Sequence, residues 1–269
     1  MSRRSGNADS TDEMGRSSPG GERVGRKARA ALSVSVGFAT LVTVLMLAAP
    51  FASAAGIVTI SAPYTGWSSS NSASTSSYGC AGAHQGVAPT WSSATGTFNY
   101  AARANASSCG TGYNYGSIYG ASTVTSAGFG GTHGQTSYIY LEWNMSVAAR
   151  AALTFTPGTG YSYAYASVSG AVYAYLIDVT NGSFNYITTS TATLFGITFS
   201  GTGLYVIQTG WATTYQYMSA TLIKGHTYEV QLTIYTYGSV SIYGGTGSGA
   251  VSIGLAGTHG LTLESLTVY

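Results

Sequence analysis

Strict alternation of apolar and polar residues in the C-terminal half of the chain limits the fold more than any other feature. Every second residue of 138–145 is apolar, and 227–237 follows the same rule more regularly. Successive side chains of a strand point to opposite faces, so a period of two predicts strands with one buried face. No segment beyond residue 54 has a convincing helical period. The residues predicted to face the core are Ile139, Leu141, Trp143 and Met145 in the first run, and Val230, Leu232 and Ile234 in the second.

Turn residues divide the remaining sequence into short strand candidates. Asn181-Gly182 lies between two strand-like runs and predicts a type I′ hairpin that pairs 171–179 with about 184–189, because that turn needs positive φ at both central residues. The last run, 261–269, alternates only if a bulge lies near Glu264-Ser265. Residues 87–126 are weakly patterned. Further strands are predicted at 151–156, 161–169, 193–199, 203–209 and 215–222. This pattern predicts an all-β fold, an antiparallel β-sandwich of the jelly-roll kind.

The N-terminal segment 1–54 has the order of an export signal. A basic cluster ends at Arg29, residues 31–49 carry no charge, and Ala52-Ser53-Ala54 offers a small-x-small cleavage site. We predict cleavage after Ala54 and a secreted protein. The alternative is an uncleaved signal-anchor helix over about 31–49, since 19 apolar residues nearly span a bilayer, which would tether the protein to the extracellular surface. Membrane contact is expected only through this helix.

The exported part is predicted to be one domain. Residues 55–79 are Ser-rich and low in aliphatic side chains, which indicates a linker or long surface loop, and 80–269 is a suitable length for a single β-sandwich domain. Cys80 and Cys109 are the two cysteines of the chain. An even count in an oxidising compartment favours a disulfide, worth about 3 kcal/mol in the loop-entropy model; the alternative is two buried free thiols.

Charge is nearly absent beyond residue 54. The basic side chains there are Arg103, Arg150 and Lys224, and the acidic ones are Glu142, Asp178, Glu229 and Glu264. This composition argues against a nucleic-acid partner, which needs clustered Lys and Arg, and against a carboxylate-rich calcium site. All 22 tyrosines of the chain lie in this part, together with abundant Ser, Thr and Gly, which favours half-buried strands and tight turns.

The few titratable residues offer little for catalysis. Glu142 lies on the predicted Tyr/Asn face of its strand and Glu229 faces outward on another, so these two are the candidate catalytic pair of a glycosidase-like hydrolase. Asp178 precedes the Asn181-Gly182 turn and is interpreted as a turn-capping group. The histidines are isolated, and no nucleophile elbow or phosphate loop occurs, so no metal or cofactor site is predicted.

Aromatic residues and sequons complete the list of candidate sites. Trp67, Trp91 and Trp211 are candidates for stacking on sugar rings, and tyrosines fall on single faces of the strands around 161–165 and 173–175. Three N-x-[ST] sequons are possible glycosylation sites, at Asn105, Asn144 and Asn181.

Three functional hypotheses follow from this sequence. The first is a structural or adhesive protein, secreted or at the cell surface, that associates with itself through sheet edges or tyrosine-rich faces. The second is a carbohydrate-binding module that contacts surface glycans. The third is a secreted hydrolase that uses Glu142 with a second carboxylate.

Overall fold

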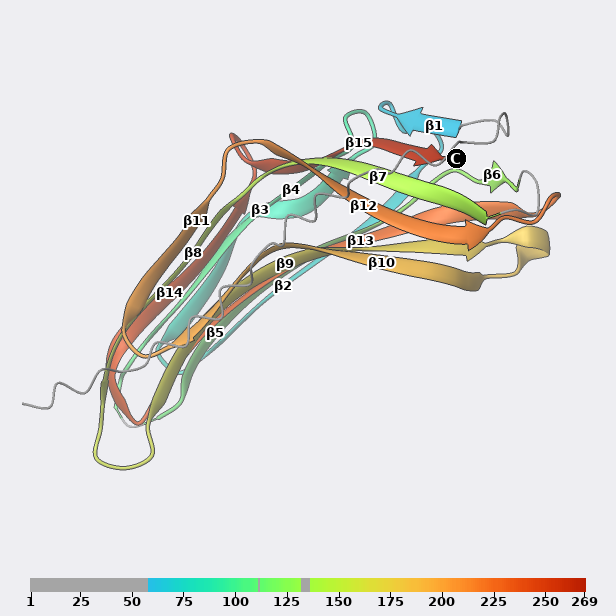
Figure 1. Cartoon of the computed structure of the whole chain (residues 1–269). Coiled ribbons are helices and arrows are strands. Elements are labelled where there is room, and N and C mark those ends of the chain that lie inside the picture. Colours follow the sequence, from blue (N-terminus) through green and yellow to red (C-terminus); the bar gives the residue numbers. More distant parts are fainter. Residues whose placement is uncertain (1–57, 111, 132–135) are drawn as a thin grey trace, which may run out of the picture. The chain divides into compact units, whose positions relative to one another are not determined.

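The computed structural model describes residues 58–110, 112–131 and 136–269, which form two antiparallel β-sheets (Figure 1). The fold is all-β, as predicted, and the predicted signal segment 1–54 lies outside the described residues. The nine-stranded sheet contains β1 (Val58–Ser61), β3 (Ala81–Ser92), β4 (Thr97–Ser107), β7 (Thr136–Ser146), β8 (Ala148–Pro157), β11 (Gly203–Gln208), β12 (Ala212–Thr221), β14 (Gly245–Leu255) and β15 (Gly260–Val268). The six-stranded sheet contains β2 (Ser68–Tyr78), β5 (Asn114–Thr125), β6 (Phe129–Gly130), β9 (Tyr163–Asp178), β10 (Asn185–Ser200) and β13 (Thr227–Tyr243).

The order of strands shows how the two sheets are connected. The six-stranded sheet runs β10-β9-β13-β5-β2, and the nine-stranded sheet contains the run β11-β8-β14-β4, with β3 paired to the free side of β4. Each strand of the first series is joined directly along the chain to its counterpart in the second: β10 to β11, β8 to β9, β13 to β14, β4 to β5 and β2 to β3. These five connections therefore join strands that follow one another in the same order in both sheets.

One hydrophobic core is shared by both sheets. Its side chains come from alternate positions of the strands, so the predicted inward residues Ile139, Leu141 and Trp143 are buried, as are Val230, Leu232 and Ile234. Met145 is only partly buried at the margin of this core. The predicted bulge in the last strand is confirmed, because the register of β15 against β7 shifts between Leu263 and Ser265 and thereby keeps Leu266 and Val268 inward.

Small residues line the core where the chain crosses between the sheets. The last three inward positions of β4 are Ala102, Ala104 and Ala106. A Cβ on Gly116 of β5 would lie 2.8 Å from the carbonyl oxygen of Asn105 and 3.0 Å from that of Gly82. The backbones of the two sheets thus approach closely here. The weak patterning of 87–126 has this cause, because alanine and glycine at the inward positions contrast little with serine and threonine at the outward ones.

In two places the structure has one long strand where the sequence predicts two consecutive short ones. β9 takes the place of the predicted strands 161–169 and 171–179, and β10 takes the place of 184–189 and 193–199. The sequence predicts separate strands on either side of Gly170, but β9 runs through it, and Phe195 of β10 is the cross-strand partner of Gly170. A Cβ at Gly170 would lie 2.6 Å from Cε1 of Phe195. This glycine therefore makes room for a ring instead of a turn. The hairpin after it is confirmed: Asn181 and Gly182, in the turn Thr180–Gly182, have φ values of 56° and 74°.

The Ser-rich segment differs from its prediction as a linker or loop. Residues Ser68–Tyr78 form β2, which pairs with β5 over its whole length and makes one edge of the six-stranded sheet. All 11 residues of β2 are exposed, so no apolar residue is needed on either face and the sequence shows no strand period. Backbone pairing to β5 and the disulfide after β2 hold a segment of low intrinsic strand propensity in place.

The predicted disulfide is confirmed between Cys80 and Cys109, with an S–S distance of 2.03 Å and a Cα–Cα distance of 5.9 Å. It links the start of β3 to the end of β4, next to the crossing from β4 to β5. Within the described residues, no helix is long and apolar enough to cross a membrane.

The nine-stranded sheet bends where three of its strands are interrupted in step. The breaks lie at Val147 between β7 and β8, at 209–211 between β11 and β12, and at 256–259 between β14 and β15. Ser146 joins these breaks: its hydroxyl donates to the carbonyl oxygen of Thr209 at 2.8 Å and lies 2.9 Å from Nδ1 of His259. The backbone N–H of Val147 donates to the Thr209 hydroxyl at 2.9 Å. These bonds satisfy backbone groups that the bend removes from the ladder.

The packing of Phe195 on Gly170 makes a testable prediction. Gly170→Ala is expected to lower the free energy of unfolding by about 1–3 kcal/mol, because the added methyl group collides with the ring. The matched control is Gly196→Ala, one residue along β10, where a Cβ meets nothing within 4 Å. That change is expected to be neutral or to stabilise by about 0.5 kcal/mol. Urea denaturation of both variants measures the difference, and equal effects contradict the packing described here.

Candidate functional site

The outward face of the six-stranded sheet is covered by hydroxyl groups. Cross-strand partners form rows of Ser, Thr and Tyr that run from β2 to β10. Glu229 is the one charged residue at the outward positions of these five strands. We call this surface the hydroxyl face. Two of its rows are Ser76, Ser117, Ser239, Ser167 and Thr198, and Ser70, Thr123, Thr233, Tyr173 and Thr191.

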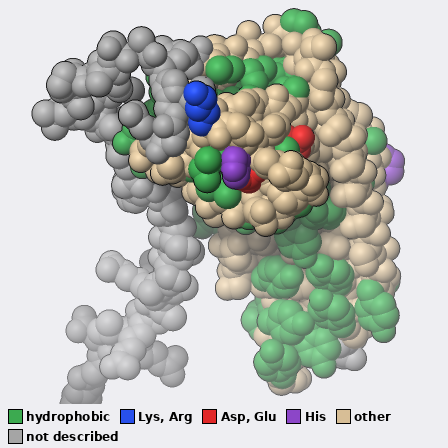
Figure 2. All heavy atoms as spheres, turned by 90° about the vertical axis from the view of Figure 1, so that its right-hand side faces the viewer, with side chains coloured by type: hydrophobic (Ala, Val, Ile, Leu, Met, Phe, Trp, Pro, Cys, Tyr) green, Lys and Arg blue, Asp and Glu red, His purple; other side chains and the backbone are tan. Residues whose placement is uncertain are grey.

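The regular spacing of this surface follows from sheet geometry. Neighbouring strands lie about 4.8 Å apart, and successive outward residues of one strand lie about 6.7 Å apart. The register of β13 with β5 and with β9 is continuous, without a bulge, so the rows stay aligned. Figure 2 shows one side of the molecule, on which few side chains are charged. The rest of that surface consists of backbone, uncharged polar side chains and hydrophobic side chains, tyrosine included.

Tyrosines on the hydroxyl face pack against one another. The rings of Tyr173 and Tyr235 are stacked with their centroids 5.4 Å apart and their planes 14° apart. The hydroxyls of Tyr115 and Tyr237 lie 2.9 Å apart, within hydrogen-bonding distance. Such aromatic pairs stabilise by about 0.5–1.5 kcal/mol beyond the area they bury. The pairs hold each ring in one orientation, which lowers the entropy cost when a partner binds.

Burial and neighbouring tyrosines oppose the ionisation of four tyrosines in this region by raising the pKa of each. Burial raises the pKa of Tyr237 to about 12. Burial, followed by neighbouring tyrosines, also raises the pKa of Tyr113 and of Tyr163, and the hydrogen bond with Tyr173 is the main cause that raises the pKa of Tyr235. The hydroxyls of these four tyrosines therefore stay protonated, and so remain both donors and acceptors of hydrogen bonds, to a higher pH than that of a free tyrosine.

Two hollows lie at opposite ends of β9. Four tyrosines, Tyr113, Tyr161, Tyr163 and Tyr243, line a hollow of about 290 Å³ at the end where the chain crosses between the sheets. The second hollow, of about 260 Å³, is lined by Tyr175, Tyr186, Ile187, Thr188 and Thr189 at the other end. Twelve residues of extended strand separate Tyr163 from Tyr175, a distance of about 40 Å. Aromatic walls thus mark both ends of the hydroxyl face.

The structure does not bring the two candidate catalytic carboxylates together. Glu142 lies on the outer face of the nine-stranded sheet, where its carboxylate oxygens accept from Tyr215 at 3.5 Å and from Ser265 at 3.4 Å. Glu229 lies on the outer face of the six-stranded sheet. The shared core separates the two outer faces, so these side chains cannot flank one glycosidic bond.

Of the three candidate stacking tryptophans, only Trp211 is well exposed, at 51%. Trp91 is buried and Trp67 is partly buried against the core. Both pack around Tyr64, with ring centroids 6.1 Å and 4.6 Å from it, and the Tyr64 hydroxyl donates to the carbonyl oxygen of Leu263. Trp67 and Trp91 therefore close one end of the core. Sequence patterns could not separate this role from ligand stacking, because both need a large ring beside a turn.

The three sequon asparagines lie apart. Asn105 is exposed on the outer face of the nine-stranded sheet, Asn144 is half-buried on β7, and Asn181 is exposed in the turn between β9 and β10. Glycosylation of each remains a prediction.

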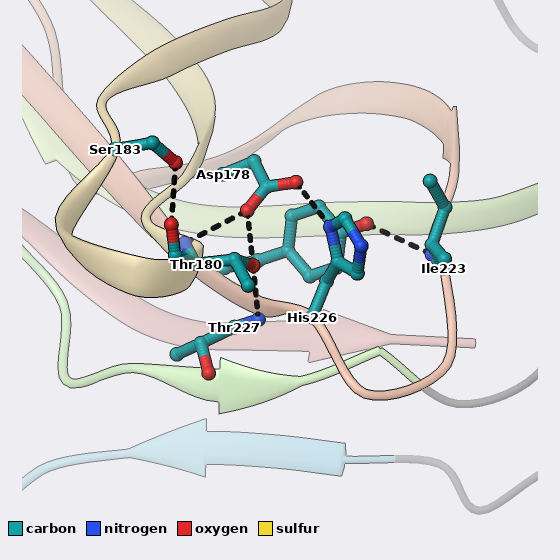
Figure 3. Close-up of polar contacts among 7 residues, drawn as sticks. Asp178, Thr180, Ser183, Ile223, His226 and Thr227 are labelled. Carbon is teal, nitrogen blue, oxygen red and sulfur yellow. Dashed lines mark hydrogen bonds and ion pairs between the residues drawn. The ribbon is translucent and has the colours of Figure 1, made fainter.

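A polar cluster joins the turn after β9 to the start of β13 (Figure 3). The Asp178 carboxylate accepts from the hydroxyl and the backbone N–H of Thr180, and its other oxygen lies 2.6 Å from Nδ1 of His226. The Thr180 hydroxyl accepts from the backbone N–H of Thr227 at 3.0 Å. Asp178 thus has the turn-capping role that the sequence predicted. Within the described residues, Asp178 is the side chain that is hydrogen-bonded to the His226 ring.

Ser146 and His259 also form a pair without a catalytic arrangement. The hydroxyl proton of Ser146 is directed to the carbonyl oxygen of Thr209, so His259 donates to the serine instead of accepting from it. A serine nucleophile needs the opposite polarity. The pair belongs to the bend in the nine-stranded sheet.

Comparison with known proteins assigns no family to the chain. No protein-family model matches the sequence, and no curated protein matches it.

The Asp178 cluster predicts a specific acid dependence. Hydrogen bonds from Thr180, followed by that from His226, lower the pKa of Asp178 to about 2 from 3.8. The stabilisation it provides is complete above pH 3.8 and is lost as the pH falls toward 2. Thermal melting should therefore depend less on pH in this window for Asp178→Asn than for the wild type.

Thr180→Val supplies the matched test of the cause. Removal of the hydroxyl donor should raise the pKa of Asp178, as measured by NMR titration of its carboxyl carbon. An unchanged pKa in Thr180→Val would show that the cluster does not control this carboxylate.

Proposed function

We propose that this protein is exported and acts as a structural or adhesive protein of the cell surface, and that its hydroxyl face binds the same face of a second copy. The observation that carries the proposal is the aligned rows of Ser, Thr and Tyr, with Glu229 as the one charged residue at their outward positions. A long surface with a single charged residue offers little electrostatic recognition of an ionic partner. It favours hydrogen bonding and aromatic contact instead.

The hydroxyl face is self-complementary. Each hydroxyl both donates and accepts a hydrogen bond, so a row of them can pair with an identical row in any register that aligns the spacing. A two-fold dimer brings the same patch of both copies together, and here no like charges oppose each other at its centre. The ordered tyrosine pairs, such as Tyr173 with Tyr235, add contact area at low entropy cost.

The fold, the N-terminal segment and the disulfide together support an extracellular role. We infer a β-sandwich of the jelly-roll kind, because five strands of each sheet are joined in matching order around one core. Residues 1–54 are assigned as the export signal or anchor. The disulfide between Cys80 and Cys109 suits an oxidising compartment.

Carbohydrate binding is the second candidate function, and the two tyrosine-lined hollows favour it. Sugar rings stack on aromatic side chains, and the hollows lie on one face with hydroxyls between them. A neutral surface glycan could extend from one hollow toward the other. The burial of Trp67 and Trp91 removes them from this role and transfers it to tyrosines such as Tyr163 and Tyr243.

A charge placed in the middle of the hydroxyl face tests self-association. Ser167→Glu adds like charges that face each other across a two-fold contact, and it should weaken the dimer about tenfold or more. Thr154→Glu, exposed on the outer face of the nine-stranded sheet, is the matched control and should leave association unchanged. Sedimentation equilibrium of the full chain in mild detergent measures both variants.

The outcomes separate the two candidate functions. A monodisperse monomer at all concentrations, in wild type and both variants, contradicts self-association. A glycan array that shows binding by the wild type and loss in Tyr243→Ala then supports the carbohydrate alternative. Loss of association in both Glu variants alike assigns the contact to a different surface.

A further inference from the structure

Two of the three basic side chains beyond residue 54 lie on one row of the nine-stranded sheet, on its outer face. Arg103 of β4 and Arg150 of β8 are both cross-strand partners of Ser252 on β14. The strands that carry the two arginines, β4 and β8, are therefore two strand spacings apart, about 10 Å. Residues 102, 104, 149 and 151, on either side of each arginine, face the core, so both arginines point outward with Ser252 between them.

The surroundings of this row leave its centre open. The adjacent outward positions hold Ala101, Gly254 and Ala148 on one side, and Asn105, Ala250 and Ala152 on the other. Four of these six side chains are single methyl groups and one is a hydrogen. The two long arginine side chains thus flank a patch of small side chains, with the Ser252 hydroxyl in its middle.

Within the described residues, neither arginine has a carboxylate partner. The ion pair that forms there joins His226 to Asp178, at the turn after β9. Glu142 and Glu264, the two carboxylates of the nine-stranded sheet, lie on β7 and β15, beyond the bend. Two like charges are held near each other in a chain that otherwise avoids charge, which costs free energy unless an anion offsets it.

We propose that Arg103, Ser252 and Arg150 form a binding site for a sulfate or phosphate group. Two guanidinium forks approach such a group from opposite sides, and the serine hydroxyl donates from the floor. A carboxylate presents both of its oxygens to one side and satisfies only one fork, whereas sulfate and phosphate carry oxygens in all directions. The site lies on the opposite sheet from the hydroxyl face, so it does not depend on the function proposed for that face.

His84 extends the row by one strand. It is the cross-strand partner of Arg103 on β3 and is exposed. On the other side, Val206 of β11 is the partner of Arg150 and is 57% exposed. The site thus has a polar flank and an apolar flank, and a sulfate or phosphate ester enters with its organic part over β11.

Arginine-selective labelling resolves this site residue by residue. The full chain is treated with phenylglyoxal in sodium sulfate or in sodium chloride of equal ionic strength, and the labelled peptides are quantified by mass spectrometry. At a sulfate concentration of about ten times Kd, labelling of Arg103 and Arg150 should slow about tenfold, because mass action leaves about a tenth of the sites free. Arg23 and Arg26 in the same chain report general screening.

Variants test whether the two arginines act together. Arg150→Gln should abolish the protection of Arg103 by sulfate, and Ser252→Ala should reduce it. Lys224→Gln removes the same charge elsewhere and should leave the protection unchanged. Equal labelling of Arg103 with and without sulfate, protection that survives Arg150→Gln, or equal protection of Arg23 and Arg26 would each overturn the proposal.

Three probes identify the source of the anion. Protection by inorganic sulfate and by dextran sulfate, but not by neutral dextran, shows a site for the oxyanion itself. Protection by dextran sulfate but not by inorganic sulfate would reflect the charge of the polymer and would overturn the proposed oxyanion site.

Discussion

Burial of one shared core between two sheets is the constraint on which the other features depend. Every strand that gives alternate side chains to this core must turn the remaining ones outward, in step with its neighbours. Bulge-free pairing of β13 with β5 and with β9 then aligns those outward side chains in rows. The hydroxyl face is therefore a consequence of core packing, combined with a composition that places Ser, Thr and Tyr at nearly every outward position.

Small inward residues allow the sheets to meet where the chain passes from one to the other. Gly116 and the last three inward alanines of β4 leave room for the backbone of the facing strand, and the disulfide holds the neighbouring crossing. Within the six-stranded sheet, Gly170 leaves room for the ring of Phe195. At two irregular points, side chains form hydrogen bonds with the backbone: Ser146 at the bend and Asp178 at the turn after β9.

The sequence predicts those parts of the fold in which apolar and polar residues alternate. β7, β13, the Asn181-Gly182 hairpin and the bulge in β15 follow from their residues, because large inward side chains contrast with polar outward ones. β2 and the region of β3 to β5 could not be predicted with the same method. Exposure on both faces removes the pattern from β2, and alanine or glycine at inward positions weakens it in β4 and β5.

The candidate surface was visible in the sequence only in part. Tyrosines that share one strand can be paired from their spacing, but rows across strands depend on register between segments far apart in the chain. Ser76 and Thr198 belong to one row although 122 residues separate them. The same holds for Arg103 and Arg150, which meet only through Ser252.

Photochemical dityrosine cross-linking can show whether copies of this protein meet through the hydroxyl face. Peptide mapping identifies the tyrosines joined between copies labelled with different isotopes. Links between copies are expected among tyrosines of the hydroxyl face, such as Tyr163, Tyr173 and Tyr243. Tyr215 and Tyr217, which are more than 60% exposed on β12 of the other sheet, are internal controls. Links between copies confined to Tyr215 and Tyr217 would contradict a contact through the hydroxyl face.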